Sequence, residues 1–98
     1  MSEKKYNAKS VRPCKGGGFL VEGTFAWPFS MEVLCRILHD RGKCAENLGV
    51  ARFVYSECDI TLYRNGRVDV NRVQSTEQAI EILDGVKAVV QEAFVRGE

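Results

Sequence analysis

The sequence predicts an α+β fold: a single curved antiparallel sheet with two helices packed on one face, in the order β-α-β-β-β(-β)-α. Its 98 residues, 45% of them apolar, suffice for one domain with a modest core. Strand-like alternation flanks the dipeptide Asn65-Gly66. A long apolar stripe at helical spacing follows near the C-terminus, where Ser75 and Gln78 form a capping box.

The first half of the domain predicts a strand followed by a helix. Residues 19–26 (FLVEGTFA) alternate in polarity and are interrupted by Trp27-Pro28. Ser30 is a suitable N-cap for a helix over residues 31–41, which carries an apolar stripe. Gly42 is expected to end that helix in the left-handed region.

The middle of the chain predicts antiparallel strands. Residues 44–49 are expected to connect the helix to a strand over 51–58, and a turn near 57–59 leads to the next strand. Asn65-Gly66 favours a two-residue type I′ turn. The side chains expected toward the core are Ile60, Leu62, Val68 and Val70. Those expected on the opposite face are Thr61, Tyr63, Asp69 and Asn71.

The two ends of the chain differ in character. Residues 1–18 are polar and basic and end in three glycines, so we expect a flexible basic arm ahead of a single domain over 19–96. A helix is predicted over residues 76–94, within which Gly85 costs about 1 kcal/mol relative to alanine. The order strand, helix, several strands, helix places both helices on one face of the sheet.

The segment LYRNGRVDVNRVQSTEQA, residues 62–79, is similar to part of the TATA-box-binding protein family. Both run from a strand through a small-residue, glycine and basic turn into a second strand, and then into a serine-capped helix. The order of elements over residues 18–94 resembles one half-repeat of that family. The resemblance implies its fold for this chain; because the family has two halves in tandem, a saddle would require a second chain.

The same resemblance implies positions for DNA contacts. Tyr63 falls where the family has an intercalating aromatic residue, and Phe53 falls at the place of its companion. Asp69 and Asn71 stand where the family lines the minor groove with a small apolar residue and a threonine, and Arg72 replaces a glycine. A carboxylate is repelled by that negative groove. The resemblance therefore supports the architecture and weakens DNA binding.

The net charge and the absence of targeting signals narrow the possible classes of function and the expected location. Fourteen basic and thirteen acidic residues give a net charge of +1, which argues against a dedicated electrostatic binder of nucleic acid. The N-terminus lacks the apolar segment of a signal peptide, and no run is apolar enough to span a membrane. We therefore predict a cytoplasmic protein whose four cysteines are reduced thiols.

One cluster suggests thiol or metal chemistry. Cys35 and His39 lie four residues apart on the predicted helix, and Cys44 follows five residues later. They could hold zinc or form a nucleophile–base pair, but there is no Cys-x-x-Cys pair and a fourth ligand would have to come from elsewhere. Buried cysteines that pack as small hydrophobic residues explain the pattern better, and the sequence predicts no catalytic residue, metal or cofactor.

The expected function is that of a small non-enzymatic binding domain that uses the helix-free sheet face. The contact residues predicted for a small molecule or protein are Thr61, Tyr63, Arg67, Asp69, Asn71 and Phe53. Homodimerisation is a further expectation, and nucleic-acid binding by the same face and the basic arm is the alternative. Glu22, Asp59 and Asp69, together with nearby arginines, are interpreted as a cross-strand charge network.

Overall fold

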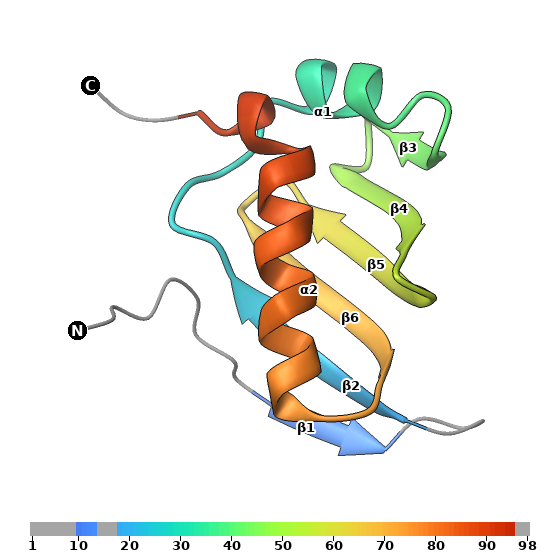
Figure 1. Ribbon diagram of the computed structural model, residues 1–98. Helices are drawn as coiled ribbons and strands as arrows, with labels where there is room; N and C mark the ends of the chain where they lie inside the picture. Colours follow the sequence, from blue (N-terminus) through green and yellow to red (C-terminus); the bar gives the residue numbers. More distant parts are fainter. Residues whose placement is uncertain (1–9, 14–17, 96–98) are drawn as a thin grey trace.

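In the described part of the chain, six antiparallel strands form one sheet, and helix α2 lies along one of its faces (Figure 1). The computed structural model describes residues 10–13 and 18–95. Within these ranges the elements are β1 (Ser10–Pro13), β2 (Phe19–Thr24), α1 (Met31–Ile37), β3 (Gly42–Ala45), β4 (Val50–Tyr55), β5 (Cys58–Tyr63), β6 (Arg67–Val73), α2 (Thr76–Val89) and the 3-10 helix η1 (Gln91–Ala93). The strand order is β1-β2-β6-β5-β4-β3. The predicted fold class, one antiparallel sheet with its helices on one face, is confirmed.

Strand β1 lies within the segment that was expected to be a flexible arm. Ser10–Pro13 pairs antiparallel with β2, opposite Phe19–Glu22. The rest of the predicted arm, apart from Gly18, lies outside the described residues.

The predicted caps start both helices. The Ser75 hydroxyl accepts a hydrogen bond from the Gln78 backbone N–H at 3.0 Å, and the Gln78 side chain reaches back to the Gln74 N–H at 2.6 Å. Ser30 caps α1 by accepting from the Val33 N–H at 3.4 Å. Both helices are shorter than predicted: α1 ends at Ile37, and η1 replaces the last turn of α2.

The shorter α1 leaves room for an edge strand that the sequence did not predict. Gly42–Ala45 forms β3 and pairs with β4. Gly42 is not in the left-handed region, so its predicted role as a helix terminator is wrong. It is needed for space, because an added Cβ would lie 2.7 Å from the Phe53 Cβ and would also meet the Arg52 carbonyl oxygen.

The turn types also differ from the prediction. The loop between β5 and β6 has three residues, in which the Gly66 N–H donates to the Tyr63 carbonyl at 2.9 Å and Gly66 has φ of 98°. This is a type I turn closed by a glycine bulge, so the predicted two-residue type I′ turn at Asn65-Gly66 is wrong. The type I′ geometry occurs instead between β4 and β5, where Ser56 and Glu57 have φ of 52° and 67°.

Replacing Ser56-Glu57 with Asn-Gly is expected to raise the free energy of unfolding by about 1 kcal/mol. Both positions need positive φ, which costs a residue with a Cβ, and Asn-Gly is the preferred type I′ pair. Denaturant titration measures the change. Glu57→Ala is the control: it removes the same charge but keeps the Cβ, and we expect a change of less than about 0.5 kcal/mol. A loss of stability in the Asn-Gly variant would contradict the turn assignment.

The core lies between the sheet and the helices. The predicted inward side chains Ile60, Leu62, Val68 and Val70 are all fully buried. Gly85 also has a packing role, because a Cβ there would meet the Tyr55 ring, with the nearest ring carbon 2.6 Å away. The glycine therefore lets α2 approach β4 closely, which offsets its low helix propensity.

Candidate functional site

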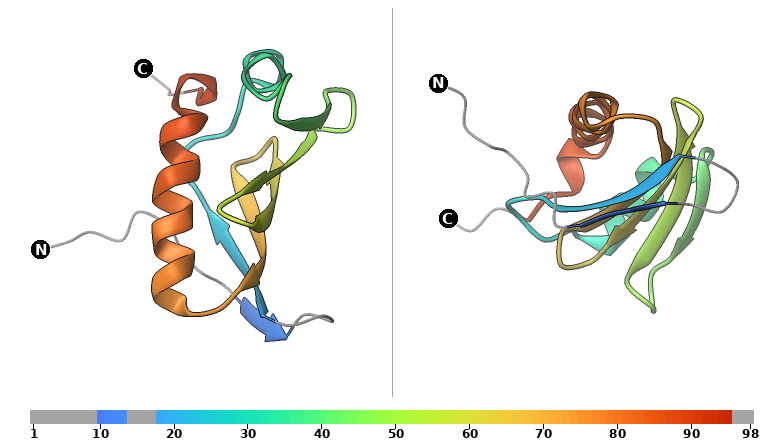
Figure 2. Two further views of the ribbon diagram at one scale, coloured as in Figure 1. Left: turned by 45° about the vertical axis from the view of Figure 1, so that its right-hand side comes forward. Right: turned by 90° about the horizontal axis from the view of Figure 1, so that it is seen from below.

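The face of the sheet opposite α2 carries a row of polar side chains. Figure 2 shows α2 on one side of the strands only. Arg52 of β4 lies opposite Thr61 of β5, Thr61 lies opposite Asp69 of β6, and Asp69 lies opposite Glu22 of β2. Directly paired residues share a face, so these four side chains line the open face together with their neighbour Tyr63.

Four of the open-face side chains form a connected network, which we call the Tyr63 network: Glu22, Tyr63, Arg67 and Asp69. The Tyr63 hydroxyl donates to Asp69 Oδ2 at 3.1 Å. The Arg67 guanidinium donates to both Asp69 oxygens at 3.3 Å and to Glu22 Oε2 at 3.0 Å. Its central carbon also lies 4.9 Å from the centroid of the Tyr63 ring. Asp69 is only 8% exposed, so the network is anchored on a buried carboxylate.

The network perturbs the protonation of two of its members. Burial raises the pKa of the Tyr63 phenol, and the negative charge of Asp69 raises it further. The Asp69 carboxylate also raises the pKa of Arg67, which keeps the guanidinium charged. Because the folded-state pKa of Tyr63 lies above its unfolded value, the associated stabilisation is fully present below pH about 10. It is lost as pH rises through the raised folded pKa.

Tyr63 is expected to titrate at higher pH than an exposed tyrosine. The chain has three tyrosines, Tyr6, Tyr55 and Tyr63. In tyrosinate absorbance measured against pH, Tyr63→Phe should remove a late step. Asp69→Asn should shift that step to lower pH, because the negative charge that disfavours ionisation is gone. A late step that survives in Tyr63→Phe would contradict the assignment.

Of the remaining predicted contact residues, two lie on the open face and one does not. Thr61 and Asn71 are half-buried on the open face, where Asn71 lies opposite Asp59. Phe53 was predicted there as well, and this is wrong. It is 4% exposed and pairs with Ile60 on the helix-covered face. The alternation of β4 puts Arg52 and Val54, not Phe53, on the open face.

A bulge in β6 adds an ion pair that sequence reasoning missed. The register between β2 and β6 shifts between Phe19 and Val21, and Arg72 has φ of 71°. The Arg72 guanidinium donates twice to Asp59 Oδ2, at 2.7 and 3.2 Å. The sequence carries no signal for this bulge, because the strained residue is an arginine rather than a glycine.

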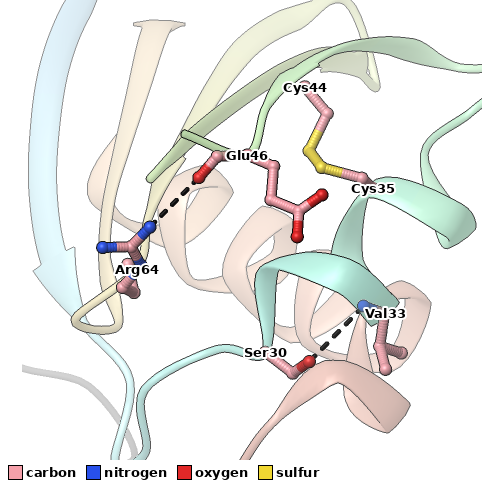
Figure 3. Close-up of a disulfide and its surroundings, with 6 residues drawn as sticks. All are labelled: Ser30, Val33, Cys35, Cys44, Glu46 and Arg64. Atoms are coloured by element: carbon pink, nitrogen blue, oxygen red, sulfur yellow. Dashed lines mark hydrogen bonds between the residues drawn. A yellow bond between two sulfur atoms is a disulfide. The ribbon is translucent and has the colours of Figure 1, made fainter. Parts of the chain in front are cut away.

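The cysteines contradict the thiol prediction. Cys35 at the end of α1 and Cys44 in β3 form a disulfide with a Cα–Cα distance of 5.3 Å (Figure 3). The cause is the early end of α1, after which the chain turns back and brings β3 beside the helix. The predicted reduced thiols at these two positions are therefore wrong, and so is a ligand set of Cys35, His39 and Cys44, since both sulfurs are bonded to each other.

Among the described residues, His39 and Cys58 do not belong to a metal site. The His39 side chain is 81% exposed and its Nδ1 lies 3.1 Å from Asp40 Oδ1. Cys58 is buried, which raises the pKa of its thiol. Within residues 10–13 and 18–95, no group of three or more His, Cys, Asp or Glu side chains could hold a metal ion. Cys14 lies outside the described residues.

Comparisons with models of protein families, with curated proteins and with solved structures gave no match. Across the described parts of the chain, no helix is both long and apolar enough to cross a membrane. The inference of function therefore rests on the chemistry of the open face.

Proposed function

We propose that this domain is a non-enzymatic binding module that docks a protein or small-molecule partner on its helix-free sheet face, centred on the Tyr63 network. The observation that carries the proposal is the Tyr63–Arg67 pair, held in place by the buried carboxylate of Asp69. Tyrosine and arginine are enriched among the residues that contribute most to binding at interfaces. Side chains that are already ordered lose less entropy when a partner binds.

The competing explanation is a charge network that only stabilises the sheet. Exposed cross-strand pairs contribute little to the free energy of unfolding, typically below about 1 kcal/mol. Stability alone therefore does not explain why Tyr63 and Arg67 are held together. A purely structural network predicts that loss of Tyr63 and Arg67 changes stability alone. A binding role predicts that their loss also abolishes recognition.

Chemical-shift mapping of the labelled protein against defined peptide and metabolite libraries tests the proposal. A ligand should perturb the amides of β5 and β6, and the Tyr63→Ala/Arg67→Ala variant should lose the perturbation. The control is Arg36→Ala, which removes an exposed arginine of α1 that pairs with Glu32. Perturbations confined to the helices, or retained in the double variant, would overturn the proposal.

Nucleic-acid binding by the same face remains the alternative. The face combines Arg52, Arg67 and Arg72 with three carboxylates, of which Asp69 and Glu22 sit beside Tyr63. The negative charges of those carboxylates repel the phosphate backbone of a nucleic acid. The alternative predicts binding to DNA or RNA that falls steeply as salt rises, and fluorescence anisotropy at two salt concentrations tests it.

Location and assembly are parts of the same proposal. The Cys35–Cys44 disulfide argues against a cytoplasmic location, because disulfides are rare in reducing compartments. Alkylation of free thiols in intact cells, followed by mass analysis, tests it.

A fold that resembles one half-repeat of the TATA-box-binding protein family would form a saddle only as a homodimer, and sedimentation velocity measures the oligomeric state.

A further inference from the structure

Three basic side chains gather at the other border of the open face, away from the Tyr63 network. Lys43 of β3 lies directly opposite Arg52 of β4. Arg41 precedes Lys43 by two residues, and both are exposed. These three residues line a hollow of about 310 Å³ together with Gly42, Val54 and Asp59. We call it the basic hollow.

The charges of the basic hollow are not balanced by the part of the chain that the structure describes. Among the described residues, Arg41, Lys43 and Arg52 have no carboxylate within ion-pair distance. The one acid in the lining, Asp59, is already engaged by Arg72 at 2.7 Å. The lining therefore carries three positive charges against one negative charge.

The position of Arg52 argues for a role beyond solubility. Like charges directly opposite each other on neighbouring strands are unfavourable. A lysine on an edge strand such as β3 discourages edge-to-edge aggregation, which explains Lys43 by itself. Arg52 has no such explanation, because β4 is an inner strand between β3 and β5. An anion between the two side chains would turn the repulsion into attraction.

We propose that the basic hollow binds a phosphate dianion, either free or as a phosphomonoester. The net charge of its lining matches a dianion better than a singly charged carboxylate or phosphodiester. The planar guanidinium groups of Arg41 and Arg52 suit phosphate oxygens, and lysine adds a third donor. Among the described residues, Phe53 is the only aromatic residue of the lining, and it is 4% exposed, so these residues offer no platform for a stacked base.

The disulfide positions the basic hollow. Cys44 is bonded to Cys35 of α1 on the helix-covered side, and its neighbour Lys43 therefore points to the opposite face of β3. The proposal does not rest on the function proposed for the Tyr63 network, because the two clusters share no residue.

Titration of the labelled protein with inorganic phosphate and with phosphoserine at constant ionic strength tests the proposal. Saturable shifts are expected at the amides of residues 41–44 and 52–54. Arg52→Gln should weaken binding about tenfold, and the matched control Arg36→Gln should leave it unchanged. Tyr63→Phe should also leave it unchanged, which separates this site from the Tyr63 network. A response to phosphoserine but not to inorganic phosphate would assign the site to esters.

Several results would overturn the proposal. They are the absence of a saturable shift, an equal response to acetate, or an Arg52→Gln variant that binds phosphate as the unaltered chain does. A dimethyl phosphate or single-stranded oligonucleotide response at least as strong as that to phosphoserine would assign the hollow to a phosphodiester backbone instead. Thermal unfolding without phosphate checks that Arg52→Gln folds, since removal of a like-charge neighbour should not lower its midpoint.

Discussion

Replacing Leu62 with alanine is expected to lower the free energy of unfolding by about 2–5 kcal/mol, because the substitution leaves a cavity in a packed core. Leu62 is 0% exposed, and it lies between Ala51 of β4 and Val68 of β6 on the helix-covered face. For a chain of 98 residues this corresponds to a fall of at least about 10 °C in the unfolding midpoint. Denaturant and thermal unfolding both measure it.

Thr61→Ala is the matched control for Leu62→Ala. Thr61 is the preceding residue of the same strand, so its side chain points to the open face, and its loss should cost less than about 0.5 kcal/mol. The pair of variants measures which face of the sheet is buried. If Thr61→Ala proved the more damaging, the helices would cover the wrong face and the proposed binding surface would have to be abandoned.

The hydrophobic alternation determined the sheet faces correctly even though the turn was misassigned. A two-residue loop at Asn65-Gly66 pairs Arg64 with Arg67, and by extension places Leu62 opposite Asp69. That pairing conflicts with the alternation, which puts Leu62 and Val68 on one face. The observed three-residue loop pairs Leu62 with Val68. The apolar pattern therefore already contained the correct register, and it outweighs the turn preference of one dipeptide.

The remaining errors share a physical origin. The segment GKCA of β3 has no apolar alternation, so only its pairing with β4 makes it a strand. The sequence likewise carries no signal for the end of α1 at Ile37, on which the approach of Cys35 to Cys44 depends. The contact of Tyr63 with Asp69 depends on the β5–β6 register, and the Arg72 bulge depends on the β2–β6 register. Local patterns do not encode such contacts between distant residues.

Removal of the Cys35–Cys44 disulfide is expected to lower the free energy of unfolding by about 2.5–3 kcal/mol. The two cysteines are nine residues apart, and in the chain-entropy model closure of a loop of this size restricts the unfolded chain by that amount. In the Cys35→Ser/Cys44→Ser variant the unfolding midpoint should fall by about 10–20 °C. The destabilisation should be concentrated at the β3 edge of the fold. Helix α1 has seven residues, too few for a helix that is stable by itself, and among the described strands β3 pairs only with β4.

Reductant provides the control for the disulfide. It should lower the midpoint of the unaltered chain to that of the Cys35→Ser/Cys44→Ser variant and leave the variant itself unchanged. Hydrogen exchange should accelerate at the amides of residues 42–45 and remain slow in β5 and β6, which lie at the centre of the sheet. A midpoint that does not respond to reductant would contradict the bond. If reductant lowers the midpoint as expected, the Cys35–Cys44 bond also restrains Lys43 on the open face. Reduction should therefore weaken phosphate binding in the basic hollow as well.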